Sequence, residues 1–92
     1  MENRIAQEVL YSGHVQGVGF RQSVYTLACK QGVHGYVQNL DNGKVRLVAG
    51  GESARVNYLL DSVKTIWAHN LSSVVRKDMP VEDHFSGFTV RY

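Results

Sequence analysis

The sequence is poor in cysteine, in net charge and in long apolar runs, and each shortage excludes a class of protein. Its 92 residues include one cysteine, Cys29, so neither an internal disulfide nor a Cys-pair metal motif can form. A lone thiol is typical of a reducing compartment, which favours a cytoplasmic location. No apolar run approaches the length of a transmembrane helix or of a signal-peptide core. The net charge is only +2, and the ten basic residues are scattered along the chain, which argues against a nucleic-acid or membrane partner.

The rest of the composition is that of a soluble globular protein. Apolar residues make up 43% of the chain and charged residues 20%, both ordinary proportions. A chain of 92 residues is long enough to bury one core between two layers, and too short for a second core. We therefore expect a single domain over residues 1–92, stable without a structural metal.

Apolar periodicity predicts the first two elements. Residues 5–13 alternate as in a strand, with Gln7 as the exception on the apolar face. In residues 21–31, apolar side chains recur three and four positions apart, and Gly32 follows as a typical helix stop. The chain therefore starts with a strand and an amphipathic helix, joined by a glycine-rich loop.

A hairpin over residues 35–40 and 44–50 is the clearest local signal. The intervening residues 41–43 read Asp-Asn-Gly, and Asn-Gly accommodates the positive φ angles of a tight turn. The side chains of the second strand expected to face the core are Val45, Leu47 and Ala49.

A second helix is predicted over residues 54–68, with Ser53 in position to cap it. Its apolar stripe consists of Val56, Leu59, Leu60, Val63, Ile66 and Trp67. Residues 71–77 indicate a further strand, 79–83 a polar turn and 85–92 a final strand. The order strand, helix, strand, strand, helix, strand, with one short extra strand, predicts an α+β sandwich of the ferredoxin-like kind. Both helices would pack on one face of an antiparallel sheet.

The residues with the most chemical information are 13–21, which read Gly-His-Val-Gln-Gly-Val-Gly-Phe-Arg. Gly17 and Gly19 allow a sharp bend, so that successive backbone N–H groups can point into one concavity that attracts an anion. The N-terminus of the following helix adds its unpaired donors, and Arg21 a permanent charge with a planar fork. The alternative is that both glycines only permit a tight strand-to-helix turn.

The loop matches neither common nucleotide motif. No Lys-Ser or Lys-Thr pair follows the second glycine as in a Walker A loop, and Gln22 stands where the dinucleotide fingerprint needs a third glycine. The favoured ligand is therefore a compact oxyanion such as phosphate. Asn39, near the end of the second strand, is the other candidate, because a side-chain amide can orient a water molecule. From spacing alone, the favoured interpretation is that Asn39 begins the turn at 41–43.

Residues 13–21, followed by Gly35-Tyr36-Val37-Gln38-Asn39-Leu40 and Gly43, resemble the acylphosphatase family. The likeness is strongest over residues 9–51 and resumes in the closing strand at 85–91. It is poor over residues 64–84, where Trp-Ala-His-Asn at 67–70 replaces the Gly-Pro step that the family often carries. This departure affects local geometry and not the two candidate catalytic positions.

The resemblance implies hydrolysis of the carboxyl-phosphate bond of small acyl phosphates to a carboxylate and inorganic phosphate. It also implies that Arg21 binds the phosphoryl oxygens and that Asn39 positions the attacking water. The phosphate-binding residues that it implies are Val15, Gln16, Gly17, Val18, Gly19, Phe20 and Arg21. It also implies that no metal or organic cofactor takes part, and we expect a monomer.

Two other functions fit parts of the pattern. One is a non-catalytic module that binds phosphate or carbamoyl phosphate, because acylphosphatase-like domains also occur inside larger maturation proteins. The other is an RNA-binding domain on the same fold. The latter is disfavoured because the strand at 44–50 lacks the aromatic side chains on which bases stack.

Overall fold

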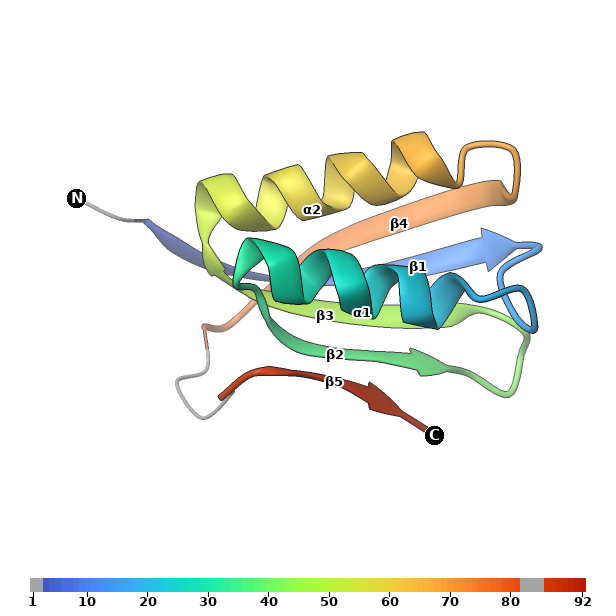
Figure 1. The fold of residues 1–92 in the computed structure, drawn as a ribbon, viewed down its shortest axis with the longest axis horizontal. Coiled ribbons are helices and arrows are strands. Elements are labelled where there is room, and N and C mark those ends of the chain that lie inside the picture. The colour runs from blue at the N-terminus through green and yellow to red at the C-terminus, as the bar shows by residue number, and fades with distance from the viewer. Residues whose placement is uncertain (1–2, 82–85) are drawn as a thin grey trace.

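The computed structural model describes residues 3–81 and 86–92. Its elements follow the predicted order along the chain (Figure 1). They are β1 (Arg4–Gly13), α1 (Phe20–Gln31), β2 (His34–Asn39), β3 (Val45–Glu52), α2 (Ser53–Ile66), β4 (Leu71–Met79) and β5 (Phe88–Arg91). No helix in this part of the chain is long and apolar enough to cross a membrane.

The strands form one sheet in the order β4-β1-β3-β2-β5, and both helices lie on the same face of it (Figure 1). β1 pairs antiparallel with β3 and β4, and β2 pairs antiparallel with β3. β5 is the exception, because it runs parallel to β2 along the outer edge. The predicted ferredoxin-like sandwich with an extra C-terminal strand is confirmed.

The core lies between the helices and the sheet. As predicted, Val45, Leu47 and Ala49 of β3 are fully buried, since alternate residues of a strand face the same side. The helices contribute Phe20, Val24 and Ala28 of α1, and Val56, Leu59, Leu60 and Val63 of α2. Burial of these apolar side chains is the main favourable contribution to folding. It fixes α1, and with it the loop before α1, against the end of the sheet.

Two predictions about α2 were wrong. Ser53 does not cap the helix: it is the first helical residue, and the cap position is Glu52, with extended backbone and no side-chain bond. The reason is that β3 pairs with β1 as far as Glu52 opposite Arg4. Ile66, predicted to lie on the buried stripe, is 58% exposed. The stripe continues from Val63 to Trp67, four positions later, and Ile66 lies beside it.

Several predicted boundaries also shift. β4 extends to Met79, where the sequence predicted a turn beginning, because its pairing with β1 continues as far as Ala6 opposite Met79. β5 begins at Phe88, and Phe85, the predicted start of that strand, lies outside the described residues. The predicted turn at 79–83 is described only as far as residue 81.

Gln7, the polar exception in the first strand, is buried between β1 and β4. Its Oε1 accepts a hydrogen bond from Arg76 Nε at 2.6 Å, and its Nε2 donates to Asp78 and to the Ala6 carbonyl. A buried amide with partners on both ends avoids the cost of an unpaired polar group. Gln7 thus links β1 to the outer strand β4 through side-chain hydrogen bonds.

Candidate active site

The loop between β1 and α1 bends at two glycines. Gly17 and Gly19 have φ angles of 76° and 84°, in the left-handed region that favours glycine. Gly19 is the cap residue of α1; the helix has no side-chain cap and no acidic residue in its first turn. The positive end of the helix dipole is therefore unopposed by a nearby carboxylate on the same turn.

The backbone N–H groups of residues 16–22 donate no hydrogen bond within residues 3–81 and 86–92. The first donor of the helix ladder is Ser23, which bonds the Gly19 carbonyl at 3.0 Å. Val15, which sequence reasoning included among the phosphate ligands, differs, because its N–H bonds the Gly13 carbonyl at 3.1 Å. The free donors thus begin at Gln16. Consecutive free N–H groups at a helix N-terminus suit an oxyanion.

Arg21 lies in the first turn of α1, and its side chain contacts the last two residues of the chain, Arg91 and Tyr92. Its Nη1 donates to the Arg91 carbonyl at 3.3 Å. Its guanidinium carbon lies 4.7 Å from the centre of the Tyr92 ring, a cation–π contact. Both contacts depend on β5 running parallel to β2, which brings the C-terminus to the end of the sheet that carries the loop (Figure 1).

Asn39 is the last residue of β2, and its side chain has an unsatisfied polar atom. Its Oδ1 is buried and has no hydrogen-bond partner within the described residues. It does not form the following turn, which Leu40 closes by donating to the Lys44 carbonyl at 2.8 Å. Asn42, and not Asn39, supplies the side-chain oxygen that caps this turn, accepting from Lys44 N–H at 3.0 Å. The turn-forming interpretation of Asn39 is therefore wrong.

A cavity of about 150 Å³ connects the loop, the helix start and the end of β2. Its lining residues are Val15, Gly17, Gly19, Phe20, Arg21, Gln22, Asn39, Val90 and Tyr92. It brings Arg21 and Asn39 together from segments 18 positions apart, whereas Gln16 and Val18 do not line it. A cavity of this size can hold a compact oxyanion.

Three lining residues were absent from the predicted site: Gln22, Val90 and Tyr92. Gln22 follows Arg21 directly, so its position at the helix start was available from the sequence. Val90 and Tyr92 reach the cavity through the parallel pairing of β5 with β2, and a period-two pattern does not say which strand is the neighbour.

Aromatic rings beneath the helix hold its first turn in place. Phe20 packs edge-on against Tyr11 and Trp67, with ring centres 5.1 and 5.2 Å apart. Trp67 Nε1 donates to Ser23 Oγ at 3.0 Å, which ties α2 to α1. Burial raises the pKa of Tyr11 well above its usual value, while the charge of Arg76 acts in the opposite direction to a smaller extent. The Tyr11 hydroxyl stays neutral and supports packing, not proton transfer.

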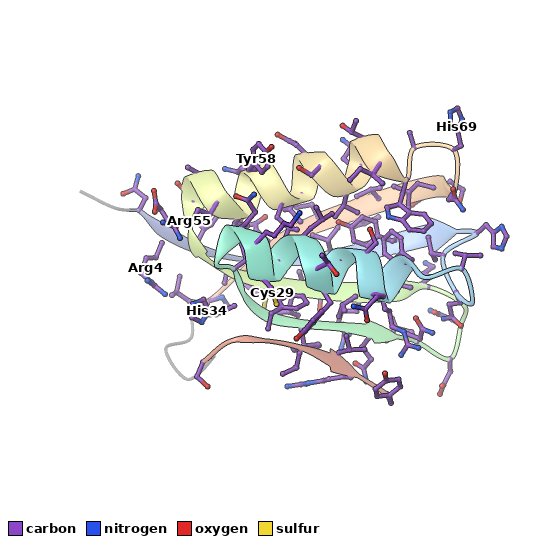
Figure 2. All side chains as sticks on the ribbon, in the orientation of Figure 1. Arg4, Cys29, His34, Arg55, Tyr58 and His69 are labelled. Carbon is purple, nitrogen blue, oxygen red and sulfur yellow. The ribbon has the colours of Figure 1, made fainter. Side chains whose placement is uncertain are left out.

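The turn at 67–70, where the chain departs from the family's Gly-Pro step, also holds the loop. His14 N–H donates to the Asn70 carbonyl at 2.8 Å, and Asn70 Nδ2 donates to the His14 carbonyl at 3.0 Å. A Cβ on Gly13 would overlap the Asn70 carbonyl, so this approach requires glycine. Figure 2 shows His69 on this turn, and Arg4, His34 and Arg55 at the opposite end of the molecule.

Other chemically active side chains lie apart from the loop. Arg4, His34 and Arg55 line a second, polar cavity of about 190 Å³, where Arg55 pairs with Glu52 at 3.4 Å. Residues 3–81 and 86–92 contain no group of three or more His, Cys, Asp or Glu arranged to hold a metal ion.

Fold and site together define a ferredoxin-like α+β domain with a glycine-rich loop of free backbone donors at one end of its sheet. A model of the acylphosphatase family matches residues 7–90. The chain belongs to the acylphosphatase family.

Curated relatives named acylphosphatase support this assignment. The Deinococcus radiodurans protein is 51% identical over 51 residues, which make up 55% of this chain and 59% of the relative. The match thus spans less than two thirds of that relative. The Thermococcus kodakarensis protein is 40% identical over 83 residues, covering 87% of this chain and 86% of the relative.

Solved structures agree with the fold. An acylphosphatase from Coxiella burnetii is 37% identical, with a TM-score of 0.84 over 97% of this chain and 94% of that one. Full-length HypF, solved in a phosphate- and nucleotide-bound form, has a TM-score of 0.85 with 21% identity. This chain covers 12% of HypF, so that likeness shows the fold alone.

Proposed function

We propose that this protein is an acylphosphatase that cleaves small acyl phosphates into a carboxylate and inorganic phosphate. The observation that carries the proposal is the unpartnered, buried Asn39 Oδ1 in the same cavity as Arg21 and the free donors of the loop. An orphaned buried acceptor costs about 1–3 kcal/mol, so it needs an explanation. A water molecule held for reaction supplies one.

In this proposal the loop and Arg21 bind the phosphoryl group. The free N–H groups of Gly17, Gly19 and Phe20, which line the cavity, donate to its oxygens, and the Arg21 guanidinium donates to two of them at once. Transfer of a phosphoryl group passes through a loose transition state, for which fixed donors and one permanent charge are the main requirement. Arg21 is already oriented by the Arg91 carbonyl and the Tyr92 ring, which limits the ordering needed on binding.

Asn39 in turn orients the nucleophile. Its Oδ1 accepts a hydrogen bond from a water molecule, which directs a lone pair of that water at phosphorus. The new P–O bond forms to water while the bond between phosphorus and the acyl oxygen breaks. The electron pair leaves on the carboxylate, and one water proton is released to solvent or to the phosphate. A carboxylate is a good leaving group, so no general acid is required.

We assign no metal or organic cofactor to the proposed reaction, because the groups that act in it are backbone N–H groups, one guanidinium and one amide. We further propose that residues 1–92 act as one domain and as a monomer. The exposed lone thiol of Cys29 supports a reducing, cytoplasmic location.

A hydrolysis assay tests the proposal. Purified protein is mixed with acetyl phosphate and EDTA, and release of inorganic phosphate is measured. We expect saturable turnover that added phosphate inhibits competitively, and none for Arg21→Ala. Phosphate binding without turnover would instead support the non-catalytic module, and undiminished activity of Arg21→Ala would remove this site from the reaction.

A further inference from the structure

The side chain of Gln16 bridges the anion-binding loop to the turn after Asn39. Gln16 Nε2 donates to the Leu40 carbonyl at 2.8 Å and to the Lys44 carbonyl at 3.0 Å. Two carbonyl acceptors on one atom fix the orientation of the amide, because only its nitrogen can donate. The bridge crosses 24 and 28 positions of sequence.

We propose that Gln16 is a positioning residue that sets the distance between the bound phosphoryl group and the water on Asn39. This inference rests on the proposed function, and it concerns the side chain of Gln16. Gln16 does not line the cavity. Its amide therefore acts through Asn39 and not on substrate.

The geometry places the bridge between the two halves of the site. On one side, Gln16 precedes Gly17, whose φ angle of 76° lies in the left-handed region. On the other, Leu40 follows Asn39 directly at the end of β2. The β1–α1 loop otherwise reaches the β2–β3 turn through no hydrogen bond within the described residues. Its glycines leave it flexible enough to need this link.

The turn itself does not depend on Gln16. The Lys44 carbonyl also accepts from Leu40 N–H at 2.8 Å, and the Leu40 carbonyl also accepts from Gly43 N–H at 3.2 Å. Each carbonyl thus keeps one partner when the Gln16 side chain is removed, and Gln16 is partly exposed, so water can replace the lost donor. Gln16→Ala should therefore fold, with its loop free to shift relative to Asn39.

Such a shift should slow the chemical step more than it weakens binding. A misplacement of 1 Å between reacting groups can cost about 100-fold in rate, and we expect a smaller displacement here, with about a tenfold loss of kcat. The loop donors and Arg21 remain, so the inhibition constant for phosphate should change less than about threefold.

A double-mutant cycle tests the inference. Wild type, Gln16→Ala, Asn39→Ala and the double variant are compared for kcat, KM and inhibition by phosphate, using acetyl phosphate. The tenfold effect of Gln16→Ala on kcat should vanish when Asn39 is already alanine, because no positioned water is left to lose. Asn42→Ala is the matched control: it removes a hydrogen bond of the same turn and does not touch the loop, so kcat should stay unchanged.

Two results would overturn the inference. One is a full tenfold loss from Gln16→Ala in the Asn39→Ala background, which would show an independent role. The other is a rise in the phosphate inhibition constant that matches the fall in kcat, which would show a general collapse of the loop.

A second readout separates this inference from the proposed function. If the wild type binds phosphate without turnover, the proposed function fails and the bridge is tested by NMR. Phosphate should then shift the Asn39 side-chain amide signal in the wild type but not in Gln16→Ala, while the backbone signals of the loop shift in both. Equal Asn39 shifts in the two proteins would contradict the bridge.

Discussion

Replacing Asn39 with alanine should lower activity while leaving the protein as stable as before, or more so. Asn39 carries a buried oxygen without a partner, and its side chain makes no hydrogen bond within the described residues. A residue that served the fold would behave in the opposite way, because its removal would break contacts. The two responses together therefore distinguish a catalytic role from a structural one.

The stability change follows from the unsatisfied acceptor. Removing a buried unpaired acceptor relieves about 1–3 kcal/mol, and water entering the open cavity reduces this to the lower end of that range. No sealed void forms, because the side chain borders an existing cavity of about 150 Å³, so the usual cavity penalty does not apply. Asparagine and alanine are both poor strand formers, which nearly cancels their propensities. A gain of about 1 kcal/mol corresponds to a rise in Tm of about 4–8 °C for a domain of this size.

The activity change follows from the loss of the oriented water. Loss of one preorganised polar group at a reacting centre costs on the order of 10²–10³ in kcat. Phosphate affinity should remain within about threefold, because Arg21 and the loop donors remain, and each of their charge-assisted bonds contributes about 1.5–3 kcal/mol.

Three measurements check this prediction: kcat with acetyl phosphate, competitive inhibition by phosphate, and urea unfolding followed by circular dichroism. Asn42→Ala serves as the control, since it removes an asparagine of the adjoining turn whose oxygen does have a partner. A drop in unfolding free energy of 1 kcal/mol or more in Asn39→Ala would refute the reasoning about the orphaned oxygen. Turnover within about threefold of wild type would remove Asn39 from the mechanism.

Further substitutions give clear expectations. Arg21→Lys should lose on the order of 10-fold or more in kcat/KM, because lysine lacks the planar fork; equal kinetics would exclude bidentate binding. Tyr92→Ala should raise KM only a few-fold, since an exposed cation–π contact contributes about 0.5–1 kcal/mol, and the Arg91 carbonyl still holds Arg21. Gly19→Ala should cost about 1–2 kcal/mol from its positive φ alone, because a Cβ there meets nothing within 4 Å; a larger loss in urea unfolding would mean an undetected clash. Burial raises the pKa of Tyr11, so the native state keeps a proton that the unfolded chain loses near pH 10. Stability should therefore fall above about pH 10, and Tyr11→Phe should abolish that part of the fall in unfolding curves measured between pH 8 and 11.

Local patterns made much of the fold predictable. The alternation in β3, the Asn-Gly turn and the four-residue spacing in α1 each depend on residues close in sequence, whose periodicity reports directly which face is buried. Ser53 and Ile66 were assigned wrongly for the complementary reason. How far β3 pairs with β1, and which end of the α2 stripe meets the core, depend on partners elsewhere in the chain.

The sequence by itself determined the loop, its glycines, Arg21 and the residue type at Asn39, because a bend and a helix start are built by neighbouring residues. Only the tertiary structure decided that the Asn39 oxygen is buried without a partner, that Gln16 links the loop to the turn, and that Arg91 and Tyr92 hold Arg21. These contacts join segments 24 to 71 positions apart. They follow from the strand order and from the parallel pairing of β5 with β2. A period-two pattern shows which face of a strand is buried, but it does not show which strand is the neighbour.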